Sequence, residues 1–270
     1  MPDLLKEYKT IQLTSDKGIC DVRLNRPDKL NALTEQMCHD LLDAFTLIGA
    51  DETMRVMVLS GNGRAFSAGG DMSSLFLKMI EDRHSGKNTF DIPRWLCDAS
   101  LALHNLPIPT IAVIHGAAIG FGVTVCLQCD LRIASEDAVL GLPFVKLGLI
   151  PEFGCTYTLP RLVGAAKAFE LVYTGKNIRA QEAKEIGLVN MVVTASELTR
   201  SVQALAANIA EGAPKAVRCA KAALRSGLDR DLRQQLGLET KGMTENLKSQ
   251  DHEEAVRAFL EKRPPTFKGR

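Results

Sequence analysis

The hydrophobic positions in the first part of the chain follow two different periods. Over residues 10–25, apolar runs on either side of an Asp-Lys-Gly turn predict a hairpin of two strands. Over 35–48, apolar residues recur at spacings of three and four, which predicts an amphipathic helix that Thr34 is placed to cap. Strands that alternate with helices in this way predict an α/β protein.

Two further apolar runs each lead into a turn built from small residues. The run RVMVLSG at 55–61 precedes AFSAGGD at 65–71, and TIAVIHG at 110–116 leads into HGAAIGFGVTV at 115–125. Glycine and alanine leave the main chain open to a ligand, and amides at a helix start carry partial positive charge. Each turn alone is typical of a strand-to-helix connection without a ligand. Their pairing predicts an oxyanion hole.

Between these turns, the segment 72–107 has no clear period. Its aromatic residues Phe76, Phe90 and Trp95 suit the wall of a pocket and suit a pair of surface helices equally well. The sequence leaves both interpretations open. Further along, strands are expected at 130–135, 138–143 and 188–193, and helices from 164 to a turn at Gly175 and over 180–186.

The remainder of the chain has helical spacing only. Breaks or caps separate predicted helices at 196–210, 214–226, 229–248 and 251–261. We therefore expect a core domain over 1–197 and a helical region over 198–270.

Composition narrows the class of protein. The 270 residues are 46% hydrophobic and 24% charged, which is typical of a soluble globular protein with one large core. The net charge of +1 and the lack of a basic stripe disfavour a nucleic-acid partner. No apolar run reaches the roughly 18 residues of a membrane span, and the first residues lack a secretory pattern. We expect a cytoplasmic protein if the source is bacterial; a eukaryotic source would allow an organellar matrix, peroxisomal or mitochondrial, although the terminal KGR is not an SKL-type signal.

The cysteine and histidine residues do not predict a metal site. Seven scattered cysteines indicate a reducing compartment and no disulfide framework. Cys126 and Cys129 form a CxxC pair, but they lie in an apolar run without a second pair, which favours core packing. The five histidines form neither an HxxxH nor an HExxH motif, so we expect no bound metal.

Several ordered motifs resemble the enoyl-CoA hydratase/isomerase (crotonase) superfamily. They are LNRPDKLNAL at 24–33, AFSAGGD at 65–71, HGAAIGFG at 115–122, CDLRIAS at 129–135 and LGLIPEFGCTYTLPRLVG at 147–164, with later likeness at 174–190 and 259–270. The resemblance implies a crotonase-like spiral of ββα units with a C-terminal helical trimerisation region. It also implies a homotrimer or hexamer that binds an acyl-CoA thioester and whose helical region helps close the CoA cleft. CoA would then be part of the substrate, and no separate cofactor is expected.

The same resemblance assigns candidate site residues. The backbone amides of Gly70 and Phe121 would form the oxyanion hole for the thioester carbonyl. A phosphate of CoA would meet Lys262. The adenine and pantetheine of CoA would be held around Lys29, Leu30, Ala32, Ser67, Ala68, Gly69, Gly70 and Asp71, with Phe121 completing the binding set.

The residues that should carry the acid–base chemistry depart from the hydratase pattern. Where the family's hydratases have two glutamates, this chain has Thr124 and Phe144, which cannot act as acid and base near neutral pH. Glu152 instead resembles the single catalytic glutamate of the peroxisomal-type Δ3,Δ2-enoyl-CoA isomerases. We therefore expect an isomerase of fatty acid β-oxidation that converts 3-enoyl-CoA to 2-enoyl-CoA, with Glu152, Gly70 and Phe121 at its centre.

Two alternatives remain. A different crotonase-type lyase, hydrolase or hydratase would use another carboxylate, such as Glu136 or Asp137. A non-catalytic binding module would keep the fold and the CoA cleft only. Without the resemblance, a lone glutamate beside a proline is typical of a solvated loop. Acyl chain length, double-bond geometry and the choice between trimer and hexamer are not predicted.

Overall fold

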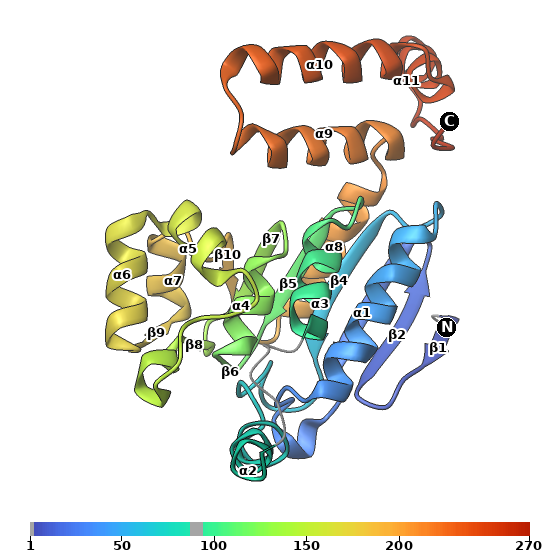
Figure 1. Ribbon diagram of the computed structural model, residues 1–270. Helices are drawn as coiled ribbons and strands as arrows, with labels where there is room; N and C mark the ends of the chain where they lie inside the picture. The colour runs from blue at the N-terminus through green and yellow to red at the C-terminus, as the bar shows by residue number, and fades with distance from the viewer. Residues whose placement is uncertain (1–2, 87–93) are drawn as a thin grey trace.

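The computed structural model describes residues 3–86 and 94–270, and its main feature is a seven-stranded sheet (Figure 1). The strands lie in the order β1-β2-β3-β4-β5-β7-β10. Their bounds are β1 Asp3–Glu7, β2 Ile11–Asp16, β3 Ile19–Leu24, β4 Val56–Gly61, β5 Thr110–Ile114, β7 Leu131–Ser135 and β10 Met191–Val193. The first three strands are antiparallel, and from β3 to β10 each pair is parallel. This confirms the predicted α/β class.

The two faces of the sheet pack against different helices. In β4, Met57 and Leu59 join the larger hydrophobic core, whereas Val56 and Val58 face the opposite side. The larger core includes side chains of α1 (Glu35–Ala50), α3 (Arg94–His104) and α4 (Phe121–Leu127), and the opposite face is covered by α8 (Leu198–Ala210). Because side chains alternate along a strand, one short apolar run can supply both cores.

A second, smaller sheet follows β5 and helps to place the predicted oxyanion turns. It has the order β6-β8-β9, with β6 at Ala117–Ile119, β8 at Val139–Gly141 and β9 at Asn177–Arg179. The 3-10 helix η3 (Pro143–Leu147) and the α-helices α5 (Cys155–Val163), α6 (Ala165–Thr174) and α7 (Ala180–Glu185) surround it (Figure 1).

The segment 72–107, whose sequence has no clear period, contains a π-helix and α-helices. A π-helix, η2 (Met72–Leu77), leads into α2 (Lys78–His84), and α3 follows after a stretch outside the described residues. The carboxylate of Asp71 accepts hydrogen bonds from the amides of Ser73 and Ser74 and so caps η2. Trp95 packs against the core beside the ring of His39, with 6.2 Å between centroids. Phe90 lies outside the described residues.

Three helices after α8 form the arm at the top of Figure 1: α9 (Pro214–Gly227), α10 (Leu232–Leu247) and α11 (Gln250–Leu260). Asp130 attaches α9 to the core, because its carboxylate binds Lys221 at 2.7 Å and Arg225 at 2.8 Å. Burial by itself would raise the pKa of Asp130, but these two cations hold it below its ordinary value. The predicted helical tail is confirmed. The domain division at residue 197 stays a prediction. Helix α8, which begins just beyond that residue, packs on the sheet.

The predicted hairpin and first helix are both present. Lys17 and Gly18 have positive φ, as a two-residue hairpin turn requires, and Thr34 accepts a hydrogen bond from the Met37 amide at 3.2 Å. Strands β1, β6 and β9 and helix α5 were not predicted. The three residues of β6 or β9 are too few to show a period. Within the described residues, no helix combines the length and hydrophobicity needed to cross a membrane.

We expect Asp130→Asn to lower the free energy of unfolding by about 3 kcal/mol, because it leaves the buried Lys221 ammonium without its counter-ion. Urea unfolding would measure this loss. Glu253→Gln, which removes an exposed pair with Arg257, is the matched control and should cost less than about 0.5 kcal/mol. Equal losses in the two variants would contradict the anchoring role of Asp130.

Candidate active site

The two glycine-rich turns lie side by side. The Ser67 amide donates to the carbonyl of Ala117 at 3.0 Å, and the Ile119 amide donates to the carbonyl of Ser67 at 2.9 Å. This short parallel pairing extends the smaller sheet by one segment at β6. The oxyanion turns, about fifty residues apart in sequence, are therefore joined by main-chain hydrogen bonds.

Close packing explains why small residues occur in these turns. A Cβ at Gly122 would lie 2.6 Å from the Ser67 carbonyl oxygen, and one at Gly69 would lie 3.1 Å from the Ile119 carbonyl oxygen. Gly69 and Gly120 also have positive φ, a conformation that L side chains rarely adopt. A larger residue at these positions would force the two segments apart.

The amides of Gly70 and Phe121 are available to a ligand. Across residues 3–86 and 94–270, neither N–H group donates a hydrogen bond, although the amides of Gly69, Asp71 and Gly120 all do. Phe121 is the first residue of α4, where a main-chain N–H carries partial positive charge. Two free donors on adjoining turns are the arrangement that binds a developing oxyanion.

Aromatic rings border these amides. The edge of the Phe76 ring lies so close to Gly70 that a Cβ there would be 2.5 Å from Phe76 Cε2. Phe144, in η3, has its ring tip next to Gly120. Phe76, one of the two described aromatics of the segment 72–107, is therefore placed against these turns.

Glu152 lies in the loop between η3 and α5, and its carboxylate has a single hydrogen-bond partner in the described chain. Thr124, one turn into α4, donates its hydroxyl to Glu152 Oε1 at 2.7 Å. Oε2 is buried with no partner. Burial raises the pKa of Glu152 to about 7, although the Thr124 hydrogen bond acts to lower it. The interpretation of Glu152 as a solvated loop residue is therefore wrong.

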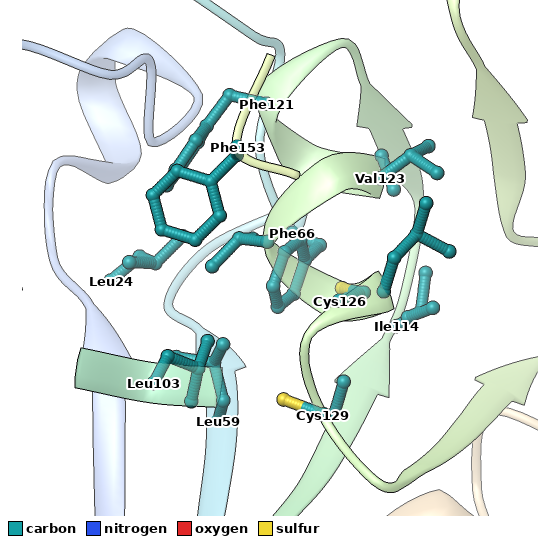
Figure 2. Close-up of a cluster of buried hydrophobic side chains, with 14 of the residues drawn as sticks. Leu24, Leu59, Phe66, Leu103, Ile114, Phe121, Val123, Cys126, Cys129 and Phe153 are labelled. Atoms are coloured by element: carbon teal, nitrogen blue, oxygen red, sulfur yellow. The ribbon is translucent and has the colours of Figure 1, made fainter. Parts of the chain in front are cut away.

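The loop that carries Glu152 is held against α4. Phe153 and Gly154 have left-handed backbones, with φ of 55° and 74°. The Phe153 ring packs edge-on against Phe121 with 5.5 Å between centroids, and Figure 2 shows the two rings together in the buried hydrophobic cluster. Helix α4 therefore contacts the loop through both Thr124 and Phe121, so it links the carboxylate to the residue that bears one of the two unpaired amides of the described chain.

The segments predicted to bind CoA also come together. The amide of Ala68 donates to the carbonyl of Leu30 at 2.9 Å, and that of Leu33 donates to the carbonyl of Gly69 at 2.7 Å. Leu30 has a left-handed backbone, and the side chains of Lys29 and Ala68 are exposed. Ala32 lies between Leu30 and Leu33 on the same segment. The two predicted stretches thus form one continuous surface beside Gly70.

Sequence reasoning missed two residues that hold this surface. Arg26 forms a 3.0 Å ion pair with Asp71 and donates to the carbonyl of Ala32. The buried Asn31 binds the carbonyls of Asn62 and Ala65 through its side chain, and its own carbonyl accepts from the Ser67 hydroxyl. Both lie within the quoted motif at 24–33, which was the available signal. Asp71 therefore has a structural role through Arg26 and η2.

The remaining candidate residues of the sequence analysis lie away from Gly70, Phe121 and Glu152. Lys262 follows α11, at the end of the molecule opposite to α4 and β6 in Figure 1. Glu136 and Asp137 are exposed at the end of β7. Asp137 lines a cleft of about 570 Å³ on the α8 side of the sheet, and none of Glu152, Gly70 and Phe121 lines it. Cys126 and Cys129 are buried, which confirms core packing.

The fold and the site together define a class of protein: an α/β scaffold that brings together two main-chain amides without partners in the described chain, from adjoining turns, and a buried carboxylate that is hydrogen-bonded to the helix bearing one of them. The chain belongs to the enoyl-CoA hydratase/isomerase family, whose model matches residues 14–270. It has the crotonase fold, with a parallel-rich sheet and a C-terminal helical region.

Relatives from several organisms cover almost the whole chain. A crotonyl-CoA hydratase of Syntrophomonas wolfei is 35% identical over 262 residues, covering 96% of this chain and 98% of the relative. An enoyl-CoA isomerase/hydratase of Mycosarcoma maydis, fer4, is 35% identical and covers 94% of this chain and 93% of its own. The crystal structure of an enoyl-CoA hydratase from Bacillus anthracis has a TM-score of 0.90 at 36% identity, over 97% of this chain and 100% of that one.

These names correct one expectation in part. The superfamily assignment is confirmed, but the relatives are named mostly as hydratases and not specifically as Δ3,Δ2-isomerases. The finer assignment therefore depends on the chemistry of the site.

Because Glu152 has a raised pKa in the folded protein, ionising it should cost stability. The contribution is fully present below the unfolded pKa of about 4.5 and is lost as the pH rises through about 7. We expect Glu152→Gln to be more stable than the wild type at pH 8 by an amount on the order of 2 kcal/mol, and the difference to vanish near pH 4.5. Denaturant unfolding at several pH values measures this. A variant less stable than the wild type at pH 8 would show that the carboxylate is not buried.

Proposed function

We propose that this protein is an acyl-CoA isomerase that moves a double bond from the 3 position to the 2 position of an enoyl-CoA, as β-oxidation of unsaturated fatty acids requires. The observation that carries the proposal is the buried carboxylate of Glu152, which has one oxygen held by Thr124 and the other without a partner among the described residues. A proton moved along a carbon chain needs one group that can both accept and donate it.

The proposed reaction has two proton transfers. Glu152 Oε2 removes a proton from C2 of the 3-enoyl-CoA, and the electron pair moves into a dienolate whose charge lies on the thioester oxygen. The amides of Gly70 and Phe121 donate to that oxygen, and each such donor contributes about 3 kcal/mol to this state. The protonated Glu152 then returns the proton to C4, which leaves the double bond at the 2 position. No metal or cofactor is required, because CoA is part of the substrate.

The surroundings of Glu152 favour rearrangement over addition of water. Thr124, at one of the two positions where the resemblance expects a hydratase glutamate, is the hydrogen-bond donor to Glu152. Phe144, at the other, is a buried ring beside Gly120. Burial raises the pKa of Glu152 against the lowering effect of the Thr124 hydrogen bond, and no neighbouring carboxylate contributes to the shift. Within the described residues, Glu152 therefore has no second carboxylate acting on it, as a two-glutamate hydration would require.

Hydration of a 2-enoyl-CoA is the second candidate. It is favoured by the relatives, which include a crotonyl-CoA hydratase and a short-chain-enoyl-CoA hydratase at 35% and 36% identity. A carboxyl group with a pKa of about 7 can also deliver a proton to an enolate, so a slow single-carboxylate hydration is chemically coherent.

A panel of 3-enoyl and 2-enoyl thioesters of graded length separates these candidates. We expect isomerisation to exceed hydration, as measured by product analysis on the purified wild-type protein. Faster hydration would replace the first candidate with the second. CoA binding without turnover of any substrate would indicate a non-catalytic module.

Replacing the proposed base should abolish most of the activity. We expect Glu152→Gln to lower kcat about 10²- to 10⁴-fold, because an amide cannot exchange the proton. Glu136→Gln, which changes an exposed carboxylate, is the control and should retain the wild-type rate. Loss of activity in the control alone would identify a different base.

The rate should depend on the ionisation of Glu152. Since the carboxylate is the active form, we expect kcat/KM to rise with pH and level off above about 7. Thr124→Val removes the hydrogen bond that lowers the pKa of Glu152, so the inflection should move to higher pH. Steady-state rates across the pH range test both statements. An unchanged inflection in the variant would show that another group titrates.

We also propose a homotrimer or hexamer. Supporting residues are the exposed apolar side chains on the arm formed by α9–α11, which include Leu224, Leu228, Leu232, Leu236, Met243, Leu247, Val256, Phe259 and Leu260. Such a run of exposed apolar residues is typical of an association surface. Sedimentation equilibrium would measure the mass, and a monomer would contradict the proposal.

A further inference from the structure

A buried glutamine connects the loop of Glu152 to the helix that bears the oxyanion donor. Gln128 follows the last residue of α4, and its side chain is almost fully buried. Its amide nitrogen donates to the carbonyl of Phe153, the residue directly after Glu152. Its amide oxygen lies 2.9 Å from Nδ1 of His104, at the end of α3.

The loop at Phe153 needs such a support. A left-handed backbone is unfavourable for a bulky L residue, because its Cβ crowds the following carbonyl oxygen, and Phe153 adopts one with φ of 55°. At the next residue a Cβ would lie 2.5 Å from Gln128 Nε2, so Gly154 lets the glutamine side chain approach the main chain. The left-handed turn at Phe153 and Gly154 therefore leaves room for the Gln128 side chain, which in turn binds the turn's main chain.

The hydrogen-bonding roles in this chain of contacts follow from the chemistry. The Phe153 carbonyl only accepts, so the amide nitrogen of Gln128 must face it and the oxygen must face His104. His104 Nδ1 must then carry a proton. Burial, followed by the charge of Arg225, lowers the pKa of His104, which keeps the ring neutral and leaves this hydrogen bond unchanged near neutral pH.

Helix α9 of the C-terminal region also binds Gln128. Arg225 of α9 donates to the main-chain carbonyls of His104 and Gln128, and its guanidinium pairs with Asp130. The glutamine backbone is thus held from the arm side while its side chain holds the catalytic loop. Within the described residues, the Glu152 carboxylate is hydrogen-bonded to Thr124 and to none of these residues.

We propose that Gln128 is a positioning residue for Glu152: it ties the left-handed turn at Phe153 to the end of α4, so that base and oxyanion donor are set by one helix. The inference rests on the proposed function. Helix α4 supplies the Phe121 amide at its start, the Thr124 hydroxyl in its first turn and Gln128 at its end. Seven residues of helix therefore set the distance between two groups that act on the same substrate.

The test compares Gln128→Met with Thr10→Val. The methionine keeps the length of the side chain but removes both hydrogen bonds. The control removes a buried side-chain hydrogen bond, from Thr10 to Asp40 at 2.7 Å, directly before β2. We expect Gln128→Met to lower kcat for 3-enoyl-CoA about tenfold or more with KM changed less than about twofold, because a displaced base loses alignment. Thr10→Val, at a comparable loss of thermal stability, should keep kcat within about twofold.

A second readout does not depend on turnover. The titration of Glu152 can be followed by ¹³C NMR of protein labelled at glutamate Cδ, with the signal assigned by its absence in Glu152→Gln. We expect the pKa of Glu152 to fall toward its ordinary value in Gln128→Met, because a loosened turn admits water to the carboxylate, and to stay unchanged in Thr10→Val.

These experiments distinguish a failure of the positioning role from a failure of the proposed function. If Gln128→Met keeps both kcat and the titration of Glu152, or if Thr10→Val changes them as much, the positioning role is overturned. If the wild type does not isomerise 3-enoyl-CoA, the proposed function fails, but an altered titration confined to Gln128→Met still supports the positioning of Glu152.

Discussion

The main-chain pairing of Ser67 with β6 is the constraint on which the site depends. It places two turns from different parts of the chain in contact, and among the residues that the structure describes the amides of Gly70 and Phe121 have no acceptors. Main-chain donors held in this way need no reorganisation when charge develops on a substrate. The requirement for glycine at 69 and 122 follows from the same pairing, since a side chain at either position would press on the opposite carbonyl.

The buried carboxylate of Glu152 lowers the stability of the fold when it is ionised. Burying Glu152 beside one neutral hydroxyl disfavours its ionised form, and the thiols of Cys38 and Cys155 around it add no positive charge. A paired carboxylate would be more stable and a weaker base. The side chain is therefore better explained by chemistry than by stability, which agrees with the general tendency of perturbed pKa values to occur at functional sites. Membership of the enoyl-CoA hydratase/isomerase family accounts for the scaffold but not for a buried glutamate at position 152.

Much of the candidate site was predictable. The small-residue motifs identified the turns of Gly70 and Phe121, and the place of Glu152 after a proline was found through the resemblance. The structure adds that Thr124 binds Glu152, whereas the sequence showed only that a glutamate was absent there. Gln128 was not predicted because nothing local marks a buried glutamine as a support for a loop 25 residues away. Hydrogen bonds between distant residues leave no period in a sequence.

The sequence by itself determined the α/β class, the hairpin, the long first helix and the helical tail, because each depends on local periodicity and turn chemistry that can be read residue by residue. Tertiary structure decided which amides stay free, which oxygen of Glu152 has a partner, and that Glu136 and Asp137 lie exposed at the end of β7. Those properties arise from burial and from contacts across the chain. Both depend on how the elements pack together, and the order of residues within any one element does not contain that information.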